Sequence, residues 1–223
     1  MRIIAVLAVG SSSAASTITF AIAVFVFAAC PAAFAQMCAG GPSLSDSPIQ
    51  LGGGLAASVK SHAVHFSATV GGPKVFATAT FEQRERTDTD RKADEIRLRV
   101  GWDLNGPMSD RLQLCPIAEF SHRNLSGRDW GPDGQSITGV ASGLFLSKTI
   151  ASAGVVRVVP TVALVAGIAS DGVESAPDGY GRFGVSFIVN RWLSLHPTFT
   201  IPAASDIPDF AVALSAIVGI GKP

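Results

Sequence analysis

The chain has 223 residues, and its 17 basic and 17 acidic side chains give a formal net charge of zero. Nucleic-acid binding calls for a basic patch or stripe, so this balance of charge excludes a nucleic-acid partner. Mean hydropathy is high at +0.38, yet after residue 35 no apolar run reaches the roughly 18 residues that indicate a membrane-spanning helix. The apolar side chains must therefore be interspersed with polar ones instead of forming one long apolar segment.

Residues 1–35 have the pattern of a cleaved signal peptide. Arg2 precedes an apolar run at 19–29, and Ala-Phe-Ala at 33–35 forms the small-x-small pattern of a signal peptidase site. Two alternatives stay open. One is an uncleaved anchor, and the other is lipidation at Cys30, because the sequence Phe-Ala-Ala-Cys resembles a bacterial lipoprotein box. We expect cleavage after the Ala-Phe-Ala site and export of the mature chain.

After a short N-terminal segment at 36–47, ten segments alternate between apolar and polar residues, which is the period of a β-strand. In 96–104, every even-numbered residue is apolar and every odd-numbered one is Arg, Gly or Asp. Lengths near ten match the ~9–11 residues that a tilted strand needs to cross a bilayer. Eight strands is the alternative count, because two segments carry Gly, Ala and Val in both phases. The ten predicted strands are 49–59, 62–71, 74–82, 95–104, 112–122, 137–148 (ambiguous), 155–169 (ambiguous), 181–190, 193–201 and 209–220.

The connections between these strands alternate in length, with one short exception near 60–62. If the N-terminus is periplasmic, the short turns lie on that side and the long polar links lie outside, as in bacterial outer-membrane barrels. Aromatic residues near the two ends of the strands suggest the two aromatic belts of a spanning barrel. The short turns are 71–73, 105–110, 151–154 and 190–191, and the long links are 83–94, 123–136, 170–180 and 202–208. The aromatic residues are Phe81, Phe120, Phe183, Phe199 and Phe210 near the long links, and Trp102 and Trp192 near the short turns.

The direction of the apolar face decides between two kinds of barrel. A soluble barrel hides this face inside, whereas an outer-membrane barrel turns it toward lipid. The sequence predicts an all-β fold: a closed antiparallel up-and-down transmembrane β-barrel over residues 48–223. The alternative is a soluble secreted or periplasmic barrel that binds a small apolar ligand, as lipocalins do. In the membrane form, the outward residues include Leu98, Val100, Leu114, Phe187, Leu195 and Leu214, and the inward ones include Arg97, Arg99, Glu119 and Thr198.

Over residues 48–221 the chain resembles small bacterial outer-membrane β-barrel proteins of the porin-like kind, most clearly in the hairpin pattern of 181–199. The resemblance implies an outer-membrane location and contact with lipid and lipopolysaccharide. It also implies insertion by the barrel-assembly machinery and a monomer with a structural, surface-binding or narrow-pore role. Such proteins usually end on an aromatic residue, but this sequence ends Ile-Gly-Lys-Pro.

Charged side chains in the inward phase form a predicted lumen network. The interior of a small barrel is narrow and filled by side chains, and an unpaired buried charge is costly. We therefore expect pairs across the lumen, such as Arg97 or Arg99 with Glu82 or Glu119. A selective pore lining is the alternative. The whole predicted network is Glu82, Arg97, Arg99, Asp103, Glu119, Arg157 and Arg182.

Two cysteines, Cys38 and Cys115, remain after the expected cleavage. Because the periplasm is oxidising, a pair there tends to be joined. Cys115 is in the inward phase near the periplasmic start of its strand, so a disulfide would tie the segment 36–47 across the barrel mouth. Two unpaired thiols are the alternative, because sequence does not show that the residues meet.

Residues suited to catalysis or metal binding are scattered. The one candidate catalytic cluster is His122 with Glu119, Ser121 and Asp129, which would make the protein an outer-membrane hydrolase with its site at the outer rim. Neither His-x₃-His nor Cys-x₂-Cys spacing occurs, and the glycines at 52–54 lie within a strand pattern rather than a phosphate-binding loop. We expect a non-enzymatic protein with no catalytic, cofactor or metal site.

Overall fold

The computed structural model describes residues 47–71, 75–87, 89–104, 112–127, 134–153, 156–190, 192–203 and 210–220. The predicted signal peptide and nearly all of the segment 36–47 lie outside these ranges. Within them, no helix is long and apolar enough to cross a membrane. The strands are β1 (Ile49–Ala57), β2 (Ser61–Gly71), β3 (Val75–Arg86), β4 (Lys92–Trp102), β5 (Gln113–Ser126), β6 (Gln135–Ser147), β7 (Ala151–Ala153), β8 (Val156–Ser170), β9 (Ser175–Ile188), β10 (Leu193–Pro202) and β11 (Ala211–Ile220).

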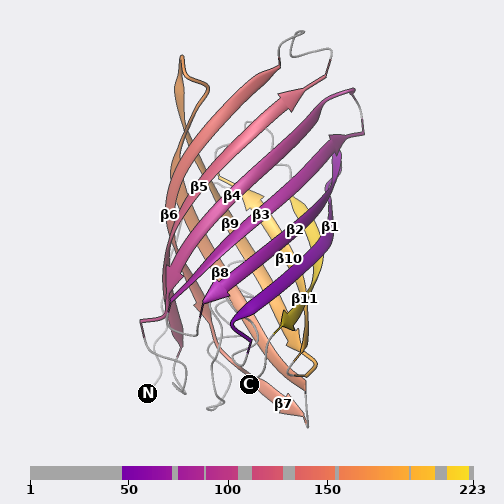
Figure 1. Cartoon of the computed structure of the whole chain (residues 1–223), viewed down its shortest axis with the longest axis vertical. Coiled ribbons are helices and arrows are strands. Elements are labelled where there is room, and N and C mark those ends of the chain that lie inside the picture. The colour runs from indigo at the N-terminus through magenta and orange to yellow at the C-terminus, as the bar shows by residue number, and fades with distance from the viewer. Residues whose placement is uncertain are drawn as a thin grey trace, which may run out of the picture. The chain divides into compact units, whose positions relative to one another are not determined.

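These strands form one closed antiparallel barrel (Figure 1). The strands pair in chain order, β6 pairs with β8, and β1 closes the ring by pairing with β11, with Ile49 opposite Ile220. The three-residue β7 pairs only with β8 among the described strands and lies outside the ring. The predicted ten-strand up-and-down barrel is confirmed, and the alternative count of eight is wrong. One end of the barrel contains the start of β1 and the finish of β11, and we call it the terminal end. We call the opposite end the hairpin end.

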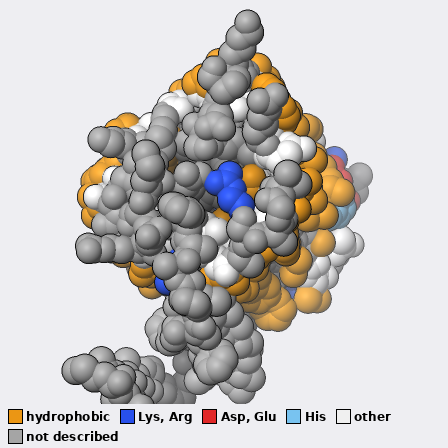
Figure 2. All heavy atoms as spheres, turned by 90° about the horizontal axis from the view of Figure 1, so that it is seen from below, with side chains coloured by type: hydrophobic (Ala, Val, Ile, Leu, Met, Phe, Trp, Pro, Cys, Tyr) orange, Lys and Arg blue, Asp and Glu red, His pale blue; other side chains and the backbone are white. Residues whose placement is uncertain are grey.

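The outer surface of the barrel is apolar. Large hydrophobic side chains are exposed on each of its ten strands, from Leu51 on β1 to Leu214 on β11. Leu98 and Val100 are both 48% exposed, and Leu114 is half-buried on the same face. Figure 2 shows hydrophobic side chains around the rim of the barrel in a view along its axis. Exposure on this scale indicates a surface made for lipid rather than water.

Polar side chains of the alternating pattern line the inner surface. Arg99 and Glu119 are buried, and Arg97 and Thr198 are half-buried. The facing predicted from the alternation is therefore confirmed for both sets of residues. It is opposite to the facing expected of a lipocalin-like soluble barrel, in which apolar side chains fill the interior.

Exposed aromatic side chains lie near both ends of the strands. Phe81 and Phe120 are exposed toward the hairpin end, and Trp102 and Trp192 toward the terminal end. The rings of Phe199 and Phe210 pack together with their centroids 5.6 Å apart. This distribution fits two aromatic belts at two membrane interfaces.

Two of the predicted long links, 83–94 and 170–180, are mostly strand, and a third, 123–136, is partly strand, which corrects the sequence analysis. β3 and β4 cover most of 83–94, with Glu85 opposite Lys92, and β5 and β6 extend into 123–136. The β8–β9 turn is reduced to four residues, 171–174. The prediction ended each strand where outward apolar residues gave way to polar ones. Backbone pairing continues beyond that point, because a ladder does not require an apolar face where both sides meet water.

An apolar cluster fills part of the barrel interior. Its buried members come from β3, β5, β6 and β8, and Tyr180 and Ala141 pack against them. Phe76 breaks the alternation of β3 by pointing inward at 2% exposure, and it lies over Gly101, where an added Cβ would be 2.5 Å from the ring. Apolar residues on both faces also explain the ambiguous phase of β6 and β8. The buried members are Phe76, Cys115, Ile117, Phe145, Ala163 and Val165.

Candidate functional site in the barrel lumen

The inner faces of β4 and β5 carry a ladder of charged side chains. Successive odd-numbered residues of β4 point inward, and the register places Arg99 opposite Glu119 on β5. Arg99 donates to Glu119 Oε2 from Nε at 2.9 Å and from Nη2 at 2.6 Å. Arg97 Nε lies 3.2 Å from the other oxygen, Oε1. One carboxylate therefore binds two guanidinium groups.

Tyr180 of β9 brings the opposite wall into this contact. Its hydroxyl accepts a hydrogen bond from Arg99 Nη2 at 2.9 Å and donates one to Glu119 Oε2 at 3.1 Å. The side chains of Arg99 and Glu119 are only 7% and 6% exposed. Charge-assisted hydrogen bonds in such a water-poor site are strong, and they hold β4, β5 and β9 at fixed positions.

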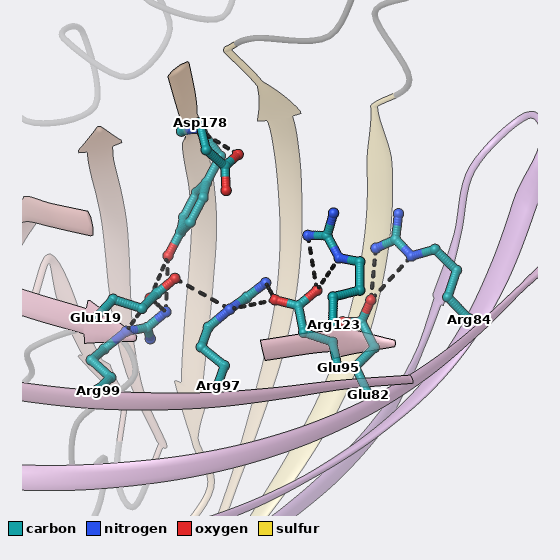
Figure 3. Close-up of polar contacts among 10 residues, drawn as sticks. Glu82, Arg84, Glu95, Arg97, Arg99, Glu119, Arg123 and Asp178 are labelled. Atoms are coloured by element: carbon teal, nitrogen blue, oxygen red, sulfur yellow. Dashed lines mark hydrogen bonds and ion pairs between the residues drawn. The ribbon is translucent and has the colours of Figure 1, made fainter. Parts of the chain in front are cut away.

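The ladder continues toward the hairpin end through Glu95 (Figure 3). Arg97 donates to Glu95 Oε1 from Nε at 3.1 Å and from Nη2 at 2.5 Å. Arg123 Nε donates to the other oxygen, Oε2, at 3.1 Å. Glu82 and Arg84 form a separate pair on β3 at 2.7 Å.

Sequence reasoning missed four members of this site: Arg84, Glu95, Arg123 and Tyr180. Each lies in the inward phase, two residues from a predicted member or further along the same strand. The strand limits used for the prediction stopped at 82 and 122 and began at 181, so three of the four fell in assumed loops. Continuing the alternation through the polar segments would have found them.

The predicted members lie in different places. Arg97, Arg99 and Glu119 come together, but Glu82 pairs with Arg84 instead of Arg97 or Arg99. These ion pairs join neighbouring positions along one wall of the barrel, whereas we expected pairs across the lumen. Distance is the reason. Glu82 and Arg84 are two residues apart on one face of β3, and Arg99 and Glu119 are opposite each other on adjacent strands, so both pairs are much closer than the far wall.

Asp103 and Arg157 lie near the terminal end, away from the ladder. Asp103 is buried and accepts a hydrogen bond from Gln113 Nε2 at 2.8 Å. The Gln113 carbonyl in turn accepts one from the Ser147 hydroxyl at 3.2 Å. Arg157 is half-buried on β8, opposite Ile188.

Arg182 of β9 has different neighbours. Its Nε donates to Thr200 Oγ1 at 3.1 Å, and its guanidinium carbon lies 4.9 Å from the centroid of the Tyr180 ring. Arg97 lies against the same ring at 5.8 Å. Among the described residues, no carboxylate is within ion-pair distance of Arg182.

The candidate catalytic cluster does not assemble. Glu119 points into the lumen, whereas His122 lies on the outer face of β5, with Nδ1 3.1 Å from the Thr138 hydroxyl. Strand alternation separates the two, since an odd and an even residue of one strand face opposite sides. Asp129 lies outside the described residues. Within the ranges that the structure describes, no group of three or more His, Cys, Asp or Glu side chains could hold a metal ion.

Cys115 is fully buried within the apolar cluster of the lumen. Its predicted partner Cys38 lies outside the described residues, so the disulfide stays a prediction. We expect the mature protein, denatured without reductant, to show no free thiol in a colorimetric assay and two after reduction. Two reactive thiols before reduction would contradict the pairing.

No protein-family model matches the sequence, and no curated protein matches it. The structure is similar to the β domain of the Bordetella autotransporter Brka, with a TM-score of 0.55 and 17% sequence identity over 81% of this chain and 86% of that chain. It also matches the translocator domain of autotransporter NalP from Neisseria meningitidis, with a TM-score of 0.43 and 8% identity over 80% and 90% of the two chains. The similarity to Brka shows a shared barrel fold. It agrees with the outer-membrane barrel that the sequence suggested, whereas the narrower assignment to small porin-like proteins stays a prediction.

Proposed function

We propose that this chain is an integral outer-membrane β-barrel protein with a structural or surface-binding, non-enzymatic role. The observation that carries the proposal is the exposed apolar surface, to which all ten strands of the ring contribute. A water-soluble protein rarely exposes contiguous apolar patches larger than a few hundred Å². The shared fold with an autotransporter β domain supports the same conclusion.

The hairpins at the hairpin end are the part of this protein suited to surface contacts. In the β3–β4 hairpin, Lys92 Nζ lies 2.7 Å from Glu85 Oε1 and lowers the pKa of that carboxyl by hydrogen bonding and charge. In the β8–β9 turn, Asp171 Oδ1 accepts hydrogen bonds from the backbone of Val173 and Glu174. These polar, ordered tips would face the cell exterior and meet lipopolysaccharide or a partner.

Fractionation tests the proposal. The mature protein should remain in the membrane pellet until detergent is added, and it should migrate differently on a gel with and without heating, as folded barrels do. A protein that is soluble without detergent and shows no heat-dependent shift would contradict the membrane assignment.

We expect the wild-type barrel to show no general-porin conductance in planar bilayers, and at most small, rare openings. The apolar cluster around Phe76 and Phe145 and the ladder from Arg99 to Arg123 occupy much of the narrow interior. Single-channel recording of the refolded protein measures this directly, with a known porin under the same conditions as the positive control. Large, steady channels would show that the interior is open.

A further inference from the structure

We propose that the hairpin-end half of the lumen is a binding site for a small, soluble, multiply charged oxyanion, and that Arg182 is the main residue that binds it. The inference goes beyond the proposed membrane role and names a ligand class for the interior of the barrel. Its three supports are a water-accessible strip of the inner wall, an excess of arginine over glutamate, and the lack of a carboxylate beside Arg182.

Water reaches the inner surface of the barrel mainly in its hairpin-end half. Around the middle of the barrel, inward residues such as Glu119 of β5 and Phe145 of β6 are buried. Inward residues of β10, β11 and β1 are half-buried in the hairpin-end half, as are His65 and Ser67 of β2, and these strands have buried inward residues closer to the terminal end, at Gln50, Thr69 and Ser194. The half-buried ones that carry polar side chains are His65, Ser67, His196, Thr198, Thr200 and Ser215.

This strip opens toward the hairpin end. On the adjoining strands β4 and β3, the exposed fraction of the arginine side chains rises from 7% at Arg99 to 20% at Arg97 and 40% at Arg84. The accessible part of the lumen is therefore a vestibule, bounded at the terminal-end side by the buried layer of Gln50, Thr69 and Ser194.

The inward glycines of β1 are covered by polar side chains of β2. An added Cβ would be 2.5 Å from Ser67 Oγ at Gly52, and 2.8 Å from the imidazole ring of His65 at Gly54. His65 Nε2 is also 2.8 Å from the Ser215 hydroxyl oxygen. The strip formed by β10, β11, β1 and β2 thus offers hydroxyl groups and an imidazole, which are suitable hydrogen-bonding partners for an anion.

The charges of the ladder and its neighbours in the hairpin-end half of the lumen do not balance. Five arginines there have three glutamates beside them, and Asp178 is exposed. Each glutamate is already engaged: Glu82 by one arginine, and Glu95 and Glu119 by two each. The arginines are Arg84, Arg97, Arg99, Arg123 and Arg182.

Arg182 is the cation whose charge these glutamates do not offset. It is half-buried, so part of the side chain reaches the vestibule while Thr200 and the Tyr180 ring orient it. Its planar fork of donors matches the oxygen geometry of phosphate and carboxylate groups. Arg97 lies against the same ring, so an anion with two charged groups can contact both arginines. This favours a diphosphate or polycarboxylate over a halide.

Calorimetric titration of the refolded mature barrel in detergent with inorganic pyrophosphate tests the proposal. We expect saturable binding to the wild type, and Arg182→Gln should weaken it by about tenfold or more, because it removes a charge-assisted ligand. The matched control is Arg84→Gln, which makes the same change in net charge in the same lumen. It should weaken binding by less than about threefold, because Glu82 already engages Arg84.

Three outcomes would overturn the proposal. They are no saturable binding of pyrophosphate, equal weakening by both variants, or binding only of phosphatidic acid in mixed micelles. The last would place the anion at the lipid surface instead of in the lumen. The heat-dependent gel shift is recorded on the same samples. A folded barrel that does not bind pyrophosphate rejects only this inference and leaves the membrane role intact.

Discussion

Replacing Glu119 with glutamine should destabilise the barrel by about 3–5 kcal/mol, the range for breaking a buried ion pair by removing one partner. The Glu119 carboxylate binds Arg97 and Arg99 and accepts a hydrogen bond from the Tyr180 hydroxyl group. Glu119→Gln keeps the shape of the side chain but leaves two guanidinium groups without their shared negative charge. Urea unfolding of the refolded protein in lipid vesicles, followed by tryptophan fluorescence, measures the change.

The control for this variant is Glu85→Gln. Glu85 also contacts a cation, Lys92 at 2.7 Å, but both side chains are exposed at the hairpin end. Water and salt screen such a pair, so we expect no measurable change in stability. If Glu119→Gln were as stable as the wild type, the ladder would contribute nothing to the fold. Combining Glu119→Gln with Arg99→Met should recover part of the loss, because it removes one of the unpaired charges.

Leu98→Arg should cost about 2–4 kcal/mol if Leu98 lies near the bilayer midplane. Leu98 points outward from the middle of β4 and is 48% exposed. In water, a charged residue at such an exposed position would be tolerated, so the loss arises only if lipid surrounds it. The same unfolding experiment in vesicles gives the value.

Val173→Arg is the matched control for the outer surface. Val173 lies in the β8–β9 turn and is 90% exposed, beyond the apolar surface of the strands. The change should stay within about 0.5 kcal/mol, as is usual for surface substitutions. A tolerated Leu98→Arg would mean that water, not lipid, covers this face.

The alternation of β4 predicted both the barrel and the direction of its side chains. Ile96, Leu98 and Val100 are separated by Arg97 and Arg99. Only one orientation of the strand places both arginine side chains inside the barrel, where they can pair with carboxylates. In β6 and β8 the alternation was weak, because the inward positions include Phe145 and Val165 of the apolar cluster. The two-residue period of a strand does not by itself show whether an apolar side chain faces lipid or lies in an apolar part of the interior.

The partners in the ion pairs were harder to predict than the direction, inward or outward, of each side chain. Which glutamate meets Arg99 depends on strand register, and register depends on turns and hydrogen bonds rather than on the period of a single strand. The pairing of Arg99 with Glu119 follows from their opposite positions on β4 and β5. Tyr180 and Arg123 were missed because polar sequence beyond the apolar surface resembles a loop, although its backbone continues the sheet.

The seam between β1 and β11 has a consequence for assembly. Nine residue pairs join these strands, from Ile49 with Ile220 to Ala57 with Val212, so the ring closes between positions almost at opposite ends of the described chain. Contacts of such long sequence separation form late and slowly. Until β11 is available, β1 and β10 are both open edges that can pair with another chain. Closure of the barrel therefore needs β1 and β11 together, and it occurs only once β11 is available.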